Sequence, residues 1–102
     1  MKEITEDNYS GFISRPLAVI AFSSPWCTSC KKIASSLDAL SGELEGRVSF
    51  GTCDISVHPA VASSLQVFSL PAVVVFKNGI EVKKVLGSVT GAAMLRSLKE
   101  LL

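Results

Sequence analysis

The chain has 102 residues, of which 48% are hydrophobic and 19% are charged, and this composition excludes a disordered chain. Its ten basic and nine acidic residues leave a net charge of +1 without a basic cluster, which argues against binding to nucleic acid. The longest apolar run, residues 17–22, is far shorter than the roughly 20 residues that cross a membrane. We therefore expect a single soluble domain over residues 1–102, without a secretion signal and located in the cytoplasm.

The first half of the chain predicts helix, strand, helix and strand in turn. Residues 5–14 should form a short helix with Thr5 as its N-cap. Residues 16–22 are mostly apolar and β-prone, as in a strand that is covered on both faces. A long helix that Gly46 can end should follow, and then a strand over residues 47–55. The apolar face of the long helix consists of Ile33, Leu37, Leu40 and Leu44.

The second half predicts a short helix, a hairpin and a final helix. The short helix should begin at Pro59, and the buried strand of the hairpin should cover residues 72–76. Asn78-Gly79 favours a two-residue turn into an antiparallel edge strand over residues 80–87. With a tiny strand at residues 2–4, this order indicates an α/β fold with a mixed sheet and helices on both faces. The final helix should pack on the core through Met94, Leu95, Leu98 and Leu102.

The motif with clear chemistry is "PWCTSCKK", residues 25–32, where the buried strand leads into the long helix. Two cysteines three residues apart on a helix lie on one face, close enough for the Cα separation of about 5–6 Å in a disulfide. The free N–H groups and the dipole of the helix start stabilise a thiolate on Cys27. We therefore expect Cys27 to attack and Cys30, one turn inside, to resolve the mixed disulfide. Trp26 should shelter the pair.

The same cysteine pair has two other interpretations, a structural crosslink and half of a metal site. Cytosolic disulfides are seldom structural, which argues against the first. A zinc or iron–sulfur site would have to recruit Cys53 and His58, and a lone C-x-x-C without a second pair falls short of four ligands. We therefore predict no metal. Cys53 is expected to be a small buried residue of a strand, and His58 to be a surface residue.

Three segments of the chain resemble the thioredoxin family. The motif "WCTSCK" is similar to the family's active site, which usually reads Trp-Cys-Gly-Pro-Cys-Lys. Residues 69–79, "SLPAVVVFKNG", resemble the segment around the family's cis-proline, and Gly87 falls where the family keeps a glycine beside the substrate groove. These anchors stand at the family's spacing, and the resemblance extends over nearly the whole chain.

The resemblance implies a thioredoxin fold, with a central mixed sheet of four to five strands flanked by helices on both faces. It also implies a cis Leu70–Pro71 peptide bond beside the cysteines, and an apolar patch where an extended substrate segment docks. That patch would consist of Trp26, Leu70, Pro71, Gly87 and Ser88.

The function that the resemblance implies is protein-disulfide oxidoreduction by a monomer. The substrates would be disulfide-containing proteins, and a thioredoxin-reductase-like electron donor would regenerate the dithiol. The protein would need no tightly bound cofactor, because the Cys27–Cys30 pair itself carries the electrons. The alternative is a thioredoxin-fold binding or redox-sensing module without significant turnover.

Two departures from the family pattern affect the expected chemistry. Ala21 stands where thioredoxins usually bury an aspartate that helps to deprotonate the second cysteine, so water or another group, with Asp54 the nearest candidate, must take that proton. Thr28 and Ser29 replace Gly-Pro between the cysteines, and their hydroxyls can donate hydrogen bonds to a thiolate.

Overall fold

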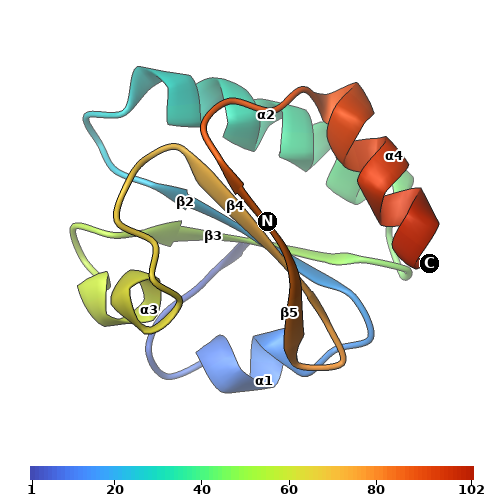
Figure 1. Ribbon diagram of the computed structural model, residues 1–102, viewed down its shortest axis with the longest axis horizontal. Helices are drawn as coiled ribbons and strands as arrows, with labels where there is room; N and C mark the ends of the chain where they lie inside the picture. Colours follow the sequence, from blue (N-terminus) through green and yellow to red (C-terminus); the bar gives the residue numbers. More distant parts are fainter.

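The computed structural model describes residues 1–102 and consists of a central sheet between two pairs of helices (Figure 1). Helices α2 and α4 cover one face of the sheet, and α1 and α3 cover the other. No helix has the length and apolar content needed to span a membrane. In chain order the elements are β1 (Lys2–Glu3), α1 (Tyr9–Ile13), β2 (Ala18–Ser23), α2 (Thr28–Glu43), β3 (Ser49–Asp54), α3 (Pro59–Ser64), β4 (Ala72–Lys77), β5 (Ile80–Leu86) and α4 (Gly91–Leu101).

The sheet has five strands in the order β1-β3-β2-β4-β5. Strands β1, β3 and β2 run parallel to one another, whereas β4 is antiparallel to both β2 and β5. This arrangement confirms the predicted mixed sheet with helices on both faces. It also brings the C-terminal end of β2 and the start of β4 to the same end of the sheet, where Phe22 pairs with Ala72.

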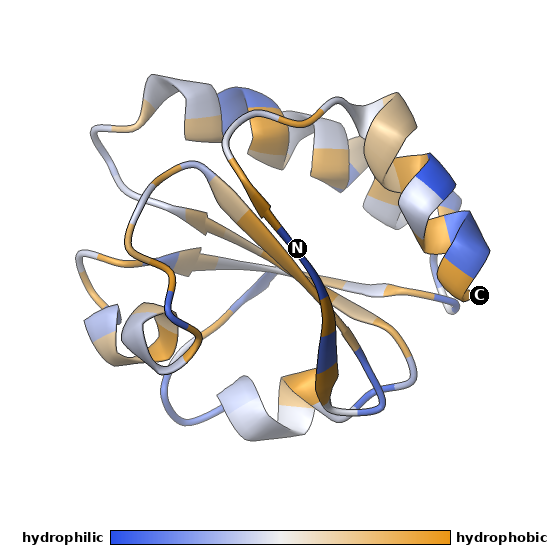
Figure 2. Ribbon diagram, viewed as in Figure 1, coloured by the Kyte–Doolittle hydropathy of each residue, from blue (hydrophilic) through white to orange (hydrophobic).

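Burial of both faces of strand β2 explains the continuous apolar run of residues 17–22. Leu17, Val19 and Ala21 join a core cluster of 13 buried residues on the side of α2 and α4. Ala18, Ile20 and Phe22 join a second cluster of 12 buried residues on the side of α1 and α3. Both faces of the strand are therefore buried, and the apolar residues concentrate in the strands and on the inner sides of the helices (Figure 2).

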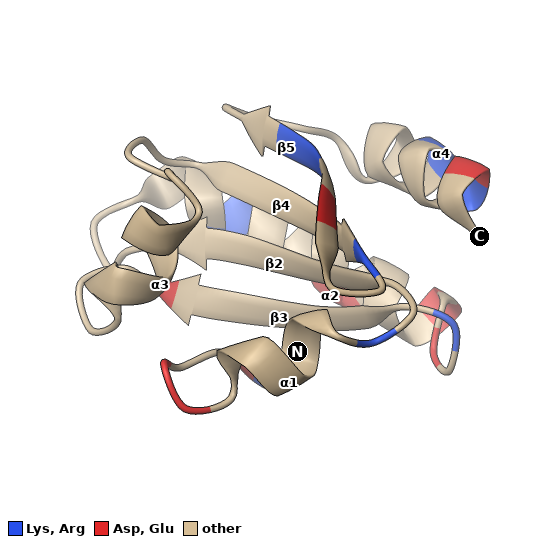
Figure 3. Ribbon diagram, turned by 60° about the horizontal axis from the view of Figure 1, so that its bottom comes forward, with Lys and Arg blue, Asp and Glu red and all other residues tan.

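The tight turn between β4 and β5 confirms the predicted hairpin. Asn78 and Gly79 both have positive φ, 53° and 86°, as a two-residue hairpin turn requires. Strand β5 is the exposed edge and carries charged side chains, as does the outer side of α4 (Figure 3). Lys83 donates to Oγ of Ser97, and Lys84 donates to the carbonyl oxygen of Leu65. These two hydrogen bonds link the edge strand to α4 and to the end of α3.

Two details of the predicted helices are wrong. The first helix begins at Tyr9 and not beside Thr5, because Oγ1 of Thr5 accepts the N–H groups of Asp7 and Asn8 and stabilises a separate turn before it. The last helix ends at Leu101, and Leu101 packs against the core while Leu102 is 47% exposed.

Gly51 in β3 is expected to tolerate no side chain. A Cβ atom there would lie 2.7 Å from Cδ1 and Cγ1 of Ile4 and 3.0 Å from Cζ of Phe12, so these two buried side chains would have to shift within the core. Gly51→Ala should therefore lower the free energy of unfolding by about 1–3 kcal/mol, measured with urea. Gly42→Ala is the control: Gly42 lies in α2 with open space around it, and the change should raise stability by about 0.5–1 kcal/mol. Equal stability of Gly51→Ala and wild type would contradict this packing.

Candidate active site

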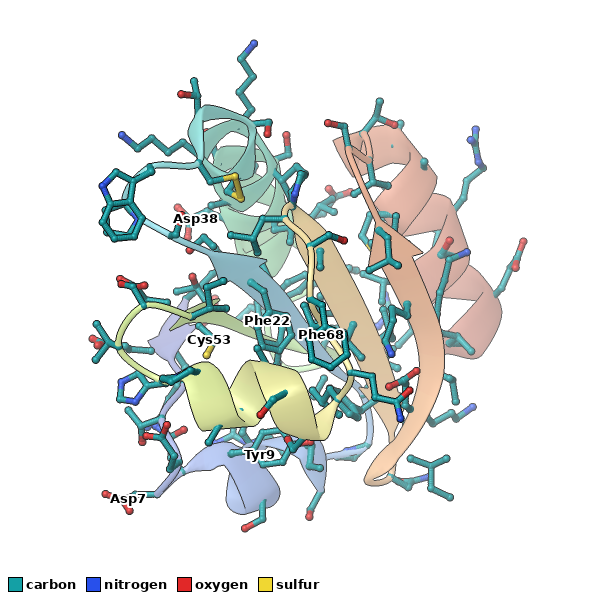
Figure 4. The ribbon with its side chains drawn as sticks, turned by 60° about the vertical axis from the view of Figure 1, so that its left-hand side comes forward. Asp7, Tyr9, Phe22, Asp38, Cys53 and Phe68 are labelled. Carbon is teal, nitrogen blue, oxygen red and sulfur yellow. A yellow bond between two sulfur atoms is a disulfide. The ribbon has the colours of Figure 1, made fainter.

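The cysteine pair lies where the loop after β2 becomes helix α2. Cys27 is the N-cap residue of α2 and Cys30 lies in its first turn, with their Cα atoms 5.3 Å apart and their sulfurs joined in a disulfide. Figure 4 shows this disulfide at the start of α2, well away from Cys53 on the other side of the sheet. The structure thus confirms that the two cysteines share one face of a helix start, as their spacing predicts.

The surroundings favour negative charge on Cys27. The backbone N–H of Cys30 donates a hydrogen bond to Sγ of Cys27 over 3.2 Å, and Oγ of Ser29 lies 3.7 Å from the same sulfur. The first turn of α2 contains no acidic residue that would oppose the helix dipole. Cys27 is partly exposed, whereas Cys30 is only 3% exposed. Of the two sulfurs, Cys27 therefore has both the access and the hydrogen bonds that a nucleophilic thiolate needs. The hydroxyl of Thr28, unlike that of Ser29, makes no hydrogen-bond contact with Sγ of Cys27.

The residues expected to form a docking patch come from three loops at the same end of the sheet as the cysteine pair. Trp26 is 80% exposed, Leu70 is partly buried, and the Leu70–Pro71 bond is cis, as the resemblance implies. The N–H of Gly87 donates to the carbonyl oxygen of Pro71 over 2.8 Å, which holds the end of β5 against this loop. Gly87 has a φ of 103°, a conformation that favours glycine. Ser88 follows and is exposed.

Phe68, which no sequence motif marks as a site residue, is 80% exposed in the loop between α3 and β4 (Figure 4). It precedes Leu70 by two residues and is a large exposed apolar side chain of the same loop. An aromatic residue just before the Leu-Pro pair was the available signal, but nothing in the sequence distinguishes an exposed phenylalanine from a buried one.

A small cavity connects Cys30 with Asp54. It has a volume of about 210 Å³ and is lined by Ser23, Ser24, Pro25, Cys30, Lys31, Ala34 and Asp54. Ala21 itself is 4% exposed and lies in the apolar cluster below α2, so no carboxylate is buried in the strand that leads to the motif. The N–H and Oγ of Ser56 both donate to Oδ1 of Asp54, and these hydrogen bonds lower the pKa of that carboxyl. Asp54 is thus an ionised turn-stabilising residue that also faces the cavity beside Cys30.

Cys53 and His58 lie apart from the cysteine pair. Cys53 is fully buried among apolar residues on the α1 and α3 side, and burial together with the negative charges of Glu6 and Asp54 raises the pKa of its thiol to about 11. His58 pairs through Nδ1 with Oε1 of Glu6 at 2.6 Å. No three histidine, cysteine, aspartate or glutamate residues are grouped so that they could hold a metal ion.

Thiol alkylation should therefore discriminate sharply among the three cysteines. After reduction, iodoacetamide at pH 8 is expected to modify Cys27 within minutes and to leave Cys53 unmodified until the protein is unfolded, because only deprotonated and accessible thiols react. Peptide mapping by mass spectrometry gives the order of modification. Alkylation of Cys53 as fast as that of Cys27 in the folded protein would contradict the burial described above.

Comparison with known proteins gives a consistent result. The thioredoxin family model matches residues 1–100 of the chain. The thioredoxin of Chlamydia caviae is 32% identical over 100 residues, which cover 98% of this chain and 97% of the relative. The thioredoxin of Mycolicibacterium smegmatis is 33% identical over 104 residues, with 97% and 92% covered. Among solved structures, a mutant thioredoxin from Halobacterium salinarum has a TM-score of 0.90 at 19% identity, covering 98% of this chain and 88% of the other.

A cysteine pair at a helix start, beside a cis-proline loop on this fold, defines a thiol–disulfide oxidoreductase. The chain belongs to the thioredoxin family. The structural likeness confirms the thioredoxin fold that the resemblance implies. Members of this family act on disulfide substrates and are reduced in turn by a reductase, with the redox disulfide as part of the protein itself.

Proposed function

We propose that the chain reduces disulfides in proteins, with Cys27 as the attacking sulfur and Cys30 as the resolving sulfur. The Cys27 thiolate attacks one sulfur of the substrate disulfide, a Cys27–substrate disulfide forms, and the other substrate sulfur leaves as a thiolate. Cys30 loses its proton to water and attacks Sγ of Cys27, which releases the second substrate thiolate and leaves the Cys27–Cys30 disulfide. Two electrons pass to the substrate in this cycle.

The observation that carries this assignment is the hydrogen bond from the N–H of Cys30 to Sγ of Cys27. A backbone donor aimed at a partly exposed sulfur at a helix start stabilises the thiolate before attack. Cys30 has no comparable access to a bulky substrate, since it is buried. The cavity toward Asp54 supports a path by which its proton reaches water during the second step.

The docking patch is proposed to consist of Trp26, Leu70, Pro71, Gly87 and Ser88, together with the neighbouring Phe68. Its support is the exposure of the two aromatic side chains and the hydrogen bond that holds Gly87 beside Pro71. Exposed apolar side chains around a reacting sulfur suit a segment of a partner protein better than they suit bulk water. An extended substrate segment would lie across the loop before Pro71.

We further propose that residues 1–102 act as one domain and as a monomer. A thioredoxin-reductase-like protein returns the Cys27–Cys30 disulfide to the dithiol, and no bound cofactor takes part. The protein works in the cytoplasm, where disulfides formed during turnover are reduced again.

A binding or redox-sensing module without turnover is the second candidate. The absence of a buried carboxylate at Ala21 favours it, because slow deprotonation of Cys30 would leave mixed disulfides long-lived.

Reduction of insulin by dithiothreitol separates the two candidates. The protein at a few micromolar should shorten the lag before the freed insulin chains precipitate, because it carries electrons from dithiothreitol to the insulin disulfides repeatedly. Turbidity that develops no faster than with dithiothreitol alone would refute the oxidoreductase and leave the binding module.

A further inference from the structure

A groove of about 410 Å³ lies between the first turns of α2 and the loop from β5 to α4. It is the larger of the two cavities in the molecule. Its lining residues are Ser29, Lys32, Ile33, Ser36, Ser88, Val89, Thr90 and Gly91. One end of the groove lies at the reacting disulfide, because Oγ of Ser29 is 3.7 Å from Sγ of Cys27. A protein joined to Cys27 in a mixed disulfide would therefore have its neighbouring residues at the mouth of this groove.

The polar groups of the lining suit negative charge. They are four hydroxyl groups and the ammonium group of Lys32, without a carboxylate, and they lie beside the apolar Ile33 and Val89. Lys32 forms no ion pair, since the three ion pairs of the protein involve other residues. The cavity on the other side of Cys30 differs, because there Lys31 shares the space with the carboxylate of Asp54.

Two helix starts add positive potential to the same groove. Helix α2 begins at Thr28 and α4 begins at Gly91, and neither has an acidic residue in its first turn. Thr90 caps α4 by accepting the N–H of Ala93, and the helix bonding of α4 begins with the N–H of Met94 to the carbonyl oxygen of Thr90. The N–H groups of Gly91 and Ala92, ahead of this capped position, have no helical acceptor and can meet an anion.

We propose that this groove accepts an acidic side chain, aspartate or glutamate, of the protein that forms the mixed disulfide with Cys27. The inference rests on the proposed function. Lys32 lies five residues along α2 from Cys27, a rise of about 7–8 Å. An extended substrate chain covers that distance in two to three residues, at about 3.3 Å each. The recognised side chain is thus two or three positions from the substrate cysteine.

Short peptides whose cysteine is joined to 2-thiopyridine test this preference. Attack by Cys27 on the peptide sulfur releases pyridine-2-thione, whose absorbance gives the rate constant. Paired peptides differ only by Glu or Gln, placed two or three residues to either side of the cysteine. At one or more of these positions the Glu peptide should react about fivefold faster than its Gln partner, a factor typical of one ion pair with support from helix dipoles.

Lys32→Gln and Lys31→Gln form a matched pair, because both remove one lysine charge from adjacent exposed positions of α2. Lys32→Gln should reduce the Glu-to-Gln rate ratio to about one, and Lys31→Gln should preserve most of it. Equal rates for all paired peptides in wild type, or equal losses in the two variants, would overturn the inference. A negative insulin assay would instead remove the proposed function, so the two failures are distinguishable.

Discussion

Cys27→Ser is expected to abolish catalysed reduction of insulin. A serine hydroxyl stays protonated near neutral pH and does not attack disulfides, so the N–H of Cys30 and the helix start would have no thiolate to stabilise. The rate should fall on the order of 10³-fold or more, to the background with dithiothreitol alone, as for the loss of other enzyme nucleophiles. Turbidity at 650 nm with matched protein concentrations provides the measurement.

Cys53→Ala is the matched control for this substitution. It also removes one sulfur, but Cys53 is buried on the face of the sheet that α1 and α3 cover, away from the Cys27–Cys30 disulfide. Its turnover should equal that of the wild type. If Cys27→Ser stayed active, or if Cys53→Ala lost activity while folded, the exchange would have to use a different pair of sulfurs.

Ala21→Asp is expected to cause the largest loss of stability. Ala21 lies in the apolar cluster between the sheet and α2, and no buried polar or charged side chain is present to receive a carboxylate. A buried charge without a partner costs about 3–5 kcal/mol. We therefore expect the free energy of unfolding at pH 8 to fall by that amount, measured with guanidinium chloride. Ala39→Asp, at an exposed position of α2, should cost less than about 1 kcal/mol.

The pH dependence of this loss has a definite sign. Burial raises the pKa of the new aspartate in the folded state above its unfolded value of about 3.9. The protonated form is therefore favoured on folding, and the cost appears only as the pH rises above the unfolded pKa and grows up to the folded pKa. The loss should be clearly smaller at pH 5 than at pH 8. The same loss at both pH values would show that the carboxylate reaches water, for example through the cavity beside Cys30.

Most of the fold could be predicted because its elements follow from local rules. The apolar spacing from Ile33 to Leu44 predicts α2, and the buried strands β2 and β4 follow from apolar runs. Asn78-Gly79 predicts the hairpin because few other pairs adopt positive φ at both positions. The start of α1 was not predictable in this way, since Thr5 has the same preference for an N-cap as for the separate turn that it stabilises.

The features of the site likewise divide into those that the sequence predicts and those that depend on tertiary structure. The roles proposed for Cys27 and Cys30 follow from their positions at a helix start, whereas the cis bond before Pro71 follows only from the resemblance to thioredoxins. The groove beside Lys32 was not predictable, because its two walls are 50 or more residues apart in the chain and meet only through packing of α4 beside α2. Exposure of Phe68 likewise depends on tertiary structure.

Trapping the mixed disulfide tests the assignment of the two sulfurs most directly. Reduced Cys30→Ser, mixed with a protein disulfide, should form a covalent adduct that persists because no resolving thiol is left. Peptide mapping without reductant should place the substrate on Cys27. Cys27→Ser should give little adduct under the same conditions, since Cys30 is buried. An equally abundant adduct on Cys30 of Cys27→Ser, or none on Cys27 of Cys30→Ser, would contradict the assignment.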